Sequence, residues 1–269
     1  MTKENKLKIV LLIGNKLWNK NTLLDFKKSD LNIVGVCVYD DSFFGFPIKY
    51  IIKSIIKKGF FKVIDQILGR IFYKVINFNF DRKKLKEIFD IKECKRVLKE
   101  LNVPIYVTNS YNNKKTLEWI SNLSPDIIVV HSHGLVGKIL RETPKTGLII
   151  GSHPGITPNY RGSHSAFWAI YNGEKEKIGY SIFHINEEID AGDLIFQKKI
   201  EILKNESYIS LGWRCMKEIS KKQIEILEEY EKTKKISKIK HEAIPVNSEY
   251  SIPGLSHYIR YLRIQKDFR

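Results

Sequence analysis

Residues 125–153 read PDIIVVHSHGLVGKILRETPKTGLIIGSH, and this stretch decides the fold. It contains two apolar runs of strand length, 125–131 and 147–153, separated by a segment that contains Gly and Pro. Continuous apolar runs of this length, bounded by turn-forming residues, are typical of strands buried on both faces of a sheet. Each run ends in a histidine, His131 or His153. The pattern therefore predicts two buried strands that each end in a polar ring.

The rest of the chain repeats this rhythm of strands and helices. Further strands are predicted at 7–13, 31–38, 103–107, 179–185 and 193–202, and helices at 19–29, 82–101 and 113–122. Strands spaced by helices favour a parallel sheet covered on both faces. The last two strands are joined by too few residues for a crossover helix, so we expect them to be antiparallel. The predicted fold is α/β, a Rossmann-like, mostly parallel seven-stranded mixed sheet. No G-x-G-x-x-G follows the first strand, so a dinucleotide site is not indicated.

Residues 43–98 interrupt this rhythm as an insertion. Its first part, 43–81, is rich in Ile, Phe and Lys, and its apolar residues recur at helical spacing. We expect two short helices packed on the flank of the domain. The alternatives are a contact in a homodimer, or an amphipathic pair lying on a membrane surface with a basic rim. That rim would consist of Lys49, Lys53, Lys57, Lys58, Lys62, Arg70 and Lys74.

The formal net charge is +16. Because the lysines are dispersed and interleaved with acidic residues, we interpret this charge as a basic surface, and nucleic acid is not the expected partner. Cys37, Cys94 and Cys215 form no metal-ligand or disulfide pattern, so no metal is expected and the thiols fit a reducing, cytoplasmic setting. No secretory leader and no apolar run of membrane-spanning length are recognised in the sequence.

The candidate site lies in two segments, GSHPGITPNYRG at 151–162 and FHINEEIDAGD at 183–193. His153 follows a buried strand and therefore lies at the edge of the sheet where open α/β sheets place ligands. Asp190 lies in a turn next to Ala-Gly. A histidine beside a carboxylate can move the proton that an attacking amine must lose during acyl transfer. These two residues are our catalytic candidates.

The same segments resemble the family of folate-dependent formyltransferases. That family carries a loop of the form N-x-H-P-S/G-x-L-P-x-Y-R-G, then N-G-E, a strand and a D-x-G turn. This chain has G-S-H-P-G-I-T-P-N-Y-R-G at 151–162, N-G-E at 172–174, the strand 179–184 and D-A-G at 190–192. The resemblance is clearest over residues 100–203. It implies a formyltransferase fold, with a catalytic domain at 1–203 that includes the insertion and a C-terminal helix and tail element at 204–269, the helix at about 206–232.

The resemblance also implies roles for individual residues. His153 and Asp190 match the catalytic His and Asp, and the co-substrate would be a formyl-tetrahydrofolate, in its 10-formyl form. The loop after the first histidine strand matches the one that lines the pterin pocket, so the implied folate-binding residues are Gly134, Leu135, Val136 and the main chain around Asp190. Arg161 and His164 are the candidates for contact with the substrate.

One position departs from the family. Gly151 stands where the family has an Asn whose side chain would donate to the formyl oxygen, and losing one such donor costs roughly 3 kcal/mol. Candidates to replace it are Ser152, His131, Ser132 and His133. If one of them does so, Gly151→Asn should be tolerated. Otherwise the chain is a catalytically impaired binding protein.

The sequence leaves the acceptor amine open. An amino sugar attached to a nucleoside diphosphate, as used for surface polysaccharide, fits the chain length best. A tRNA-linked amine and another small metabolite are the alternatives.

Overall fold

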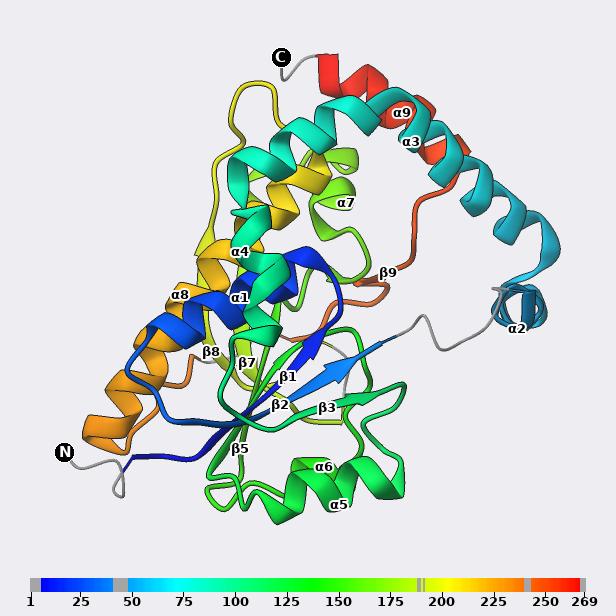
Figure 1. The fold of residues 1–269 in the computed structure, drawn as a ribbon. Coiled ribbons are helices and arrows are strands. Elements are labelled where there is room, and N and C mark those ends of the chain that lie inside the picture. Colours follow the sequence, from blue (N-terminus) through cyan, green and yellow to red (C-terminus); the bar gives the residue numbers. More distant parts are fainter. Residues whose placement is uncertain (1–5, 41–47, 188–189, 191, 240–242, 267–269) are drawn as a thin grey trace.

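The core of the molecule is one seven-stranded sheet with the order β3-β2-β1-β4-β5-β7-β8 (Figure 1). A computed structural model of the chain describes residues 6–40, 48–187, 190, 192–239 and 243–266. The strands are β1 (Ile9–Gly14), β2 (Ile33–Tyr39), β3 (Ile105–Thr108), β4 (Ile127–His131), β5 (Leu148–His153), β7 (Gly179–His184) and β8 (Leu194–Lys199). Strands β1 to β5 pair in parallel, whereas β7 is antiparallel to both β5 and β8. The predicted mixed sheet, with its antiparallel late pair, is confirmed.

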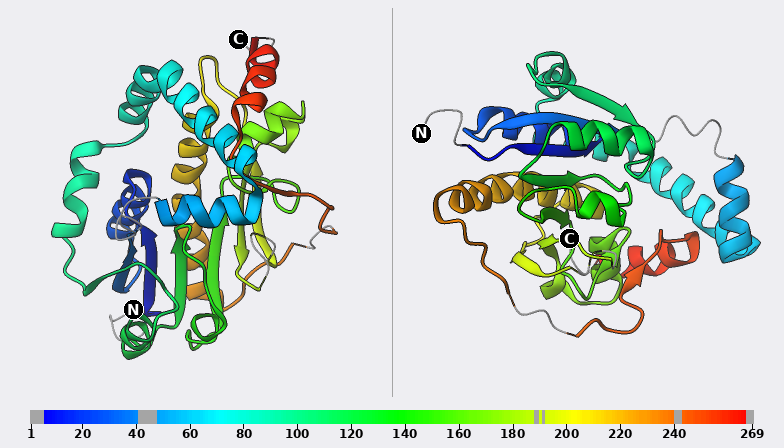
Figure 2. Two further views of the ribbon diagram at one scale, coloured as in Figure 1. Left: turned by 90° about the vertical axis from the view of Figure 1, so that its right-hand side faces the viewer. Right: turned by 90° about the horizontal axis from the view of Figure 1, so that it is seen from below.

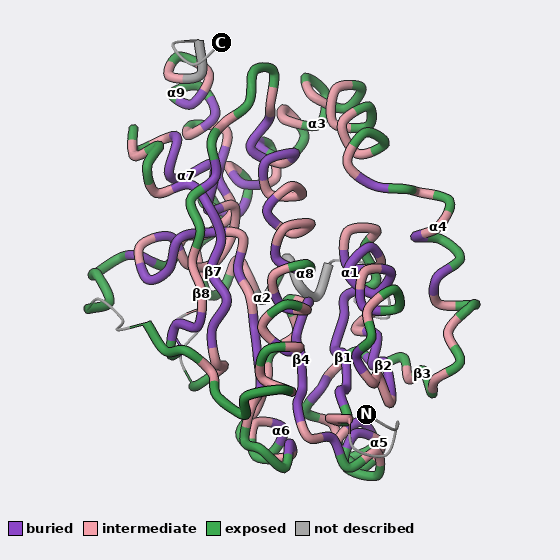
Figure 3. Tube along the Cα trace, turned by 90° about the vertical axis from the view of Figure 1, so that its left-hand side faces the viewer, coloured by how far each residue is buried: buried purple, intermediate pink, exposed green. Residues whose placement is uncertain are grey.

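Helices cover both faces of the sheet, as predicted. They are α1 (Leu17–Lys28), α2 (Ile48–Lys58), α3 (Phe60–Ile88), α4 (Ile91–Arg96), α5 (Lys114–Asn122), α6 (Lys138–Arg141), α7 (Ser165–Tyr171), α8 (Tyr208–Thr233) and α9 (Leu255–Lys266), with short 3₁₀ turns at Val97–Lys99 and Lys175–Lys177. The larger core joins the sheet to α1, α7 and α8, and the smaller core joins the other face to α5 and α6. Figure 3 shows the central strands as the continuous buried layer between them.

The first part of the insertion forms the two expected helices, α2 and α3, but α3 is far longer than predicted, and α4 follows it within the insertion. Helix α3 runs for 29 residues, and the predicted helix at 82–101 was wrong because the chain breaks inside it. Phe89 is extended and buried, and the Asp90 side chain then accepts a hydrogen bond from the Glu93 amide to begin α4. Residues 43–47 of the predicted insertion lie outside the described residues. Among the described residues, no helix combines the length and apolarity needed to cross a bilayer.

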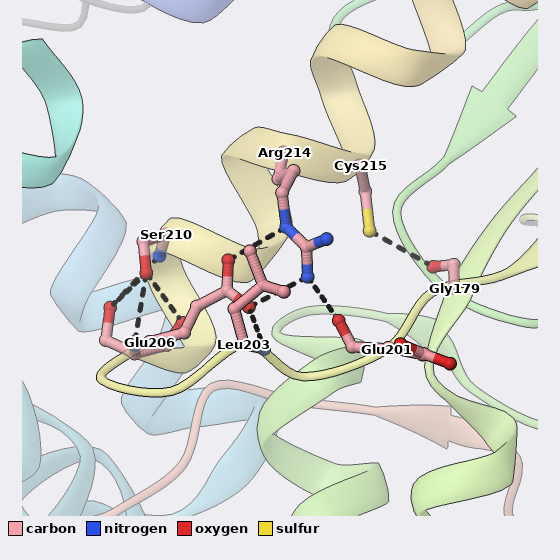
Figure 4. A network of polar contacts seen from close by, with 8 residues as sticks. Gly179, Glu201, Leu203, Glu206, Ser210, Arg214 and Cys215 are labelled. Carbon is pink, nitrogen blue, oxygen red and sulfur yellow. Dashed lines mark hydrogen bonds and ion pairs between the residues drawn. The ribbon is translucent and has the colours of Figure 1, made fainter. Parts of the chain in front are cut away.

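The C-terminal region packs closely against the rest of the chain. A short strand, β9 (Glu249–Tyr250), pairs with β6 (Arg161–Gly162), and α9 packs against α3 and α7. Figure 4 shows how α8 is attached at its start: Arg214 binds the Glu206 carboxylate through Nε and Nη2, at 2.9 and 2.8 Å, and Nη2 also donates to the Glu201 carbonyl. Ser207 and Ser210 form the N-terminal cap. The division at residue 203 stays a prediction.

His131 joins three elements at the end of β4. Its ring is buried between α1 and α8, where Nδ1 lies 3.1 Å from the Thr22 hydroxyl and Nε2 contacts Gln223. Asn19 of α1 donates to the His131 carbonyl. Burial lowers the pKa of this histidine to about 4, from an ordinary value of 6.5. The folded protein therefore holds His131 neutral.

We expect this neutral ring to make the fold sensitive to acid. The unfolded chain takes up a proton at His131 below about pH 6.5 and the folded chain only near pH 4, so stability falls as pH falls through this window. Each such proton contributes up to about 1.4 kcal/mol per pH unit. In urea unfolding at pH 5 to 7, His131→Gln should reduce this dependence by the share of one proton, while His133→Gln, at an exposed histidine, should leave it unchanged. An unchanged slope in His131→Gln would rule out this residue as the source.

Candidate active site

His153 is the last residue of β5, and one of its ring nitrogens already takes part in a hydrogen bond. Its Nε2 lies 2.9 Å from the Tyr160 carbonyl oxygen, and because a carbonyl can only accept, Nε2 must carry the proton. In the neutral ring this leaves Nδ1 as the nitrogen with a free lone pair. Nδ1 lies 3.5 Å from Oδ2 of Asp190. The structure therefore brings the two catalytic candidates together and directs the basic nitrogen of His153 toward Asp190.

The position of Asp190 is determined by its own backbone and by the loop after β5. Asp190 has a left-handed backbone, with φ of 51°, and its Oδ2 accepts a hydrogen bond from the Gly162 amide at 3.1 Å. Its side chain is 23% exposed, whereas that of His153 is 7% exposed. The Asp190 carboxylate is thus partly exposed, whereas the imidazole of His153 is covered. Such a carboxylate can contact an incoming amine and also orient the ring.

The loop between β5 and β6 is held from two sides. On the sheet side, the Ser181 hydroxyl of β7 donates to the Gly155 carbonyl at 2.8 Å and accepts from the Thr157 amide at 3.0 Å. Gly155 is needed because a Cβ there would lie 2.8 Å from Cδ2 of the His153 ring. The loop backbone and the catalytic ring therefore pack as one unit.

On the other side, the C-terminal tail closes the loop. The Arg161 amide donates to the Ser248 carbonyl at 2.9 Å, and Arg161 Nε donates to the Ser248 hydroxyl at 3.1 Å. Tyr250 stacks between Tyr160 and Trp168, with ring centroids 5.2 and 5.1 Å apart. Sequence reasoning missed Ser248 and Tyr250, because they lie nearly 90 positions from the loop and match no motif. The observed role of Arg161 is to bind this tail, and its predicted substrate contact stays a prediction.

The predicted folate loop after β4 is tightly packed. Ser132 accepts hydrogen bonds from the Tyr111 hydroxyl at 2.9 Å and from the Gly134 amide at 3.3 Å. A Cβ on Gly134 would lie 2.6 Å from the Tyr111 ring, so only glycine fits there. The Asn112 side chain bridges the Leu135 carbonyl and the Gly137 amide at 3.0 and 2.7 Å.

The outer side of this loop is more open. The Val136 carbonyl accepts from Arg141 at 3.0 Å, and the Leu135 side chain is 70% exposed. The loop backbone is thus held in place while one of its apolar side chains faces outward, which is compatible with a flat apolar ligand.

Two of the four candidates to replace the family Asn were wrong. His131 lies in the core between α1 and α8, as described above. Ser152 pairs with Ile182 across the sheet, so it shares the α8 face and points away from the face of His153, with its buried hydroxyl unpartnered among the described residues. Ser132 is engaged by Tyr111, and His133 is exposed with its ring edge against Tyr39, 5.0 Å away.

His164 was also expected at the substrate, and its half-buried side chain packs against the start of α8. It precedes α7 with a left-handed φ of 60°, and its ring lies 5.6 Å from the Tyr208 ring at the start of α8. Burial, and then the charge of Arg70, lower its pKa to about 4. This neutral ring packs between α7 and α8, so the substrate contact is not supported.

The space beside Gly151 is already filled. A Cβ at this position would lie 2.7 and 2.8 Å from Cγ1 and Cδ1 of Ile185, and 3.1 Å from the Phe183 ring. The side chain of Ile185 therefore occupies the volume that an Asn side chain would need. An Asn at this position requires the Ile185 side chain to move, so we expect Gly151→Asn to be less well tolerated than the sequence suggests.

Comparison with known proteins agrees with this geometry. Residues 75–238 match the family described as Formyl transferase, which is more than half of the chain. The match begins inside α3 and continues beyond α8, so it extends further in both directions than the quoted motifs. The chain therefore belongs to the formyl transferase family.

Individual relatives show the extent of the similarity. A methionyl-tRNA formyltransferase from Thermotoga neapolitana is 35% identical over 139 residues, which are 51% of this chain and 44% of that protein. The chain thus spans less than half the length of this relative. The fold is similar to that of a phosphoribosylglycinamide formyltransferase from Anaplasma phagocytophilum (TM-score 0.58, 12% identity, 89% and 97% of the two chains). It is also similar to that of a sugar N-formyltransferase from a Shewanella species (TM-score 0.51, 15% identity, 96% and 87%).

The filled space beside Gly151 gives a stability test. We expect Gly151→Asn to lower the free energy of unfolding by about 2 kcal/mol, because overpacking displaces Ile185. Ile185→Ala should offset part of this cost, so that the double variant loses about 1 kcal/mol less than the sum of the single variants. Gly212→Asn in α8, where a Cβ meets open space, is the matched control and should change stability little. A Gly151→Asn variant as stable as the parent would refute the overlap.

Proposed function

We propose that this protein transfers a formyl group from a formyl-tetrahydrofolate, in its 10-formyl form, to the amine of a small substrate. The observation that carries the proposal is the His153–Asp190 pair, 3.5 Å apart at the edge of the sheet, with His153 Nε2 fixed on the Tyr160 carbonyl. Membership of the formyl transferase family supports the same reaction class.

The geometry suits the proton movement that this reaction requires. When the amine nitrogen attacks the formyl carbon, a C–N bond forms, the carbonyl oxygen gains negative charge and the amine must lose a proton. We assign the acceptance of that proton to Nδ1 of His153, with the Asp190 carboxylate stabilising the imidazolium that results. The Nδ1–H formed in this way can donate to the developing oxyanion. It can then pass its proton to the folate nitrogen as the bond between that nitrogen and the formyl carbon breaks, which releases tetrahydrofolate.

The folate would lie against the 132–136 loop. The side chains of Ser132 and Asn112 hold the backbone of this loop. The loop therefore presents a rigid edge of main-chain groups next to the exposed Leu135. A preformed loop costs little entropy when a planar ring binds to it. Gly134, Leu135, Val136 and the main chain at Asp190 are therefore the proposed contacts.

For the acceptor we favour an amino sugar attached to a nucleoside diphosphate. The sugar N-formyltransferase from Shewanella shares the fold over 96% of this chain and 87% of its own length. A tRNA-linked amine is the second candidate, because the methionyl-tRNA formyltransferase is 35% identical and the net charge is +16. A catalytically impaired binding protein is the third, because neither His131 nor Ser152 replaces the missing side-chain donor.

The catalytic pair is tested by isosteric substitution. His153→Gln and Asp190→Asn should each lower kcat by about 100-fold or more, because each removes one partner of the proton transfer, while the melting temperature stays near that of the parent. His184→Gln is the matched control, since His184 of β7 lies next to Gly147 at the opposite edge of the sheet. Parent-like turnover in either site variant would remove that residue from the mechanism.

The identity of the acceptor amine can be tested directly. The purified chain is incubated with 10-formyl-tetrahydrofolate and either a panel of nucleoside-diphosphate amino sugars or aminoacylated initiator tRNA, and the products are weighed by mass spectrometry. Formylation of an amino sugar supports the proposal, and formylation confined to the tRNA would replace it. If folate binds but no amine gains a formyl group, the binding-protein alternative holds.

A further inference from the structure

Helix α3 has a firmly packed inner face. Val63, Gln66 and Gly69 are buried, and a Cβ on Gly69 would lie 2.7 Å from the Gly254 backbone, so α3 lies almost in contact with the chain that leads into α9. Gln66 donates to the Ile252 carbonyl at 2.8 Å, and the Tyr73 and Tyr208 rings lie 4.8 Å apart. These contacts fix the rotation of α3 about its own axis.

The opposite face of α3 is apolar as well, and it is exposed. Its outward side chains recur every three or four residues, so they form one stripe along the helix. This outer stripe consists of Phe60, Ile64, Leu68, Ile71, Val75 and Phe78, with Phe61 at its border. Two of these positions, Phe61 and Val75, are 86% and 78% exposed. A surface helix normally presents polar residues on this side.

Exposed apolar side chains also occur on α2. Gly59, whose φ is 89°, separates the two helices, and beyond it Ile56 is 81% exposed and Ile52 is also exposed. Figures 1 and 2 show α2 at the outer end of α3, away from the sheet. Both helices thus carry apolar side chains that the described residues of this chain leave exposed, and the stripe along α3 is of the kind that marks an interaction site.

The charges around this surface are of one sign. Between residues 48 and 80 the sequence has seven Lys and Arg but a single acidic residue, Asp65. Asp65 is engaged by the Ser256 amide and hydroxyl, at 3.2 and 3.0 Å. Lys57 and Lys74 are exposed near the stripe, whereas Lys62 is exposed on the other side of α3. A second copy of this chain would bring the same positive charge to a symmetric contact, and such a contact would be opposed by like-charge repulsion.

We propose that the outer face of α2 and α3 binds an anionic membrane surface. The apolar stripe would enter the boundary between headgroups and acyl chains, and the lysines beside it would contact the anionic headgroups. This role is independent of the proposed reaction, because the surface lies on the insertion and none of its residues takes part in the His153–Asp190 site. Its consequence would be an enzyme held at the membrane by an interfacial contact.

The test is flotation of the full chain with vesicles. Vesicles of phosphatidylcholine containing about one third phosphatidylglycerol should carry the protein upward, and pure phosphatidylcholine vesicles should carry much less. Ile64→Gln combined with Ile71→Gln keeps every charge and should lower binding by about tenfold. Lys57→Glu and Lys74→Glu together should lower it by at least about tenfold and remove the preference for anionic lipid.

Matched controls use the far side of the molecule. Ile139→Gln, at an exposed isoleucine of α6, controls for loss of apolar surface, and Lys115→Glu and Lys138→Glu together control for charge. Both should bind like the parent.

Three results would overturn the proposal. The first is a parent protein that does not float with anionic vesicles. The second is an Ile64→Gln, Ile71→Gln variant that binds as well as the parent, since binding would then reflect net charge alone. The third is a dimer, measured by light scattering, that this variant converts to a monomer, because the stripe would then be covered by a second copy.

Discussion

The site depends on the two different pairings of β5. On one side β5 pairs in parallel with β4, which brings their carboxyl ends, and the loops that follow them, to the same edge of the sheet. On the other side β5 pairs with antiparallel β7, and this register places Ser181 opposite His153. Ser181 then binds the backbone of the loop that carries Gly155 and Thr157. A shift of one residue in either register would turn His153 to the opposite face of the sheet.

The C-terminal tail also helps to hold the loop that the sheet positions. Gly162 donates to Asp190 from the same short strand that pairs with Glu249 and Tyr250, so one backbone segment connects the Asp190 carboxylate to the C-terminal tail. Tyr250, stacked between Tyr160 and Trp168, contributes aromatic contact area on both of its ring faces. The tail is therefore part of the structure that orients the site, even though it contributes none of the candidate catalytic residues.

Two features of this chain concern how its side chains pack. Next to the site, Ile185 fills the space beside Gly151, so apolar contact replaces a polar side chain at the face that carries His153. On the insertion, α3 uses one face to hold α9 and α8 and leaves a second apolar face outward. The first would limit which groups can stabilise charge during the proposed reaction. The second changes which surfaces the protein can meet, without contact with the site.

The sequence by itself determined the seven strands, their mostly parallel arrangement and the identity of His153 and Asp190, because apolar periodicity and short motifs are local properties of the chain. It also indicated two helices in the insertion. Only the tertiary structure decided which face of the sheet each side chain uses, and so assigned His131 and Ser152 to the α8 side and His164 to the start of α8. It alone brought Ser248 and Tyr250 to the catalytic loop and showed Ile185 against Gly151. These are contacts between residues far apart in the chain, and no local pattern records which distant side chain will fill a given space.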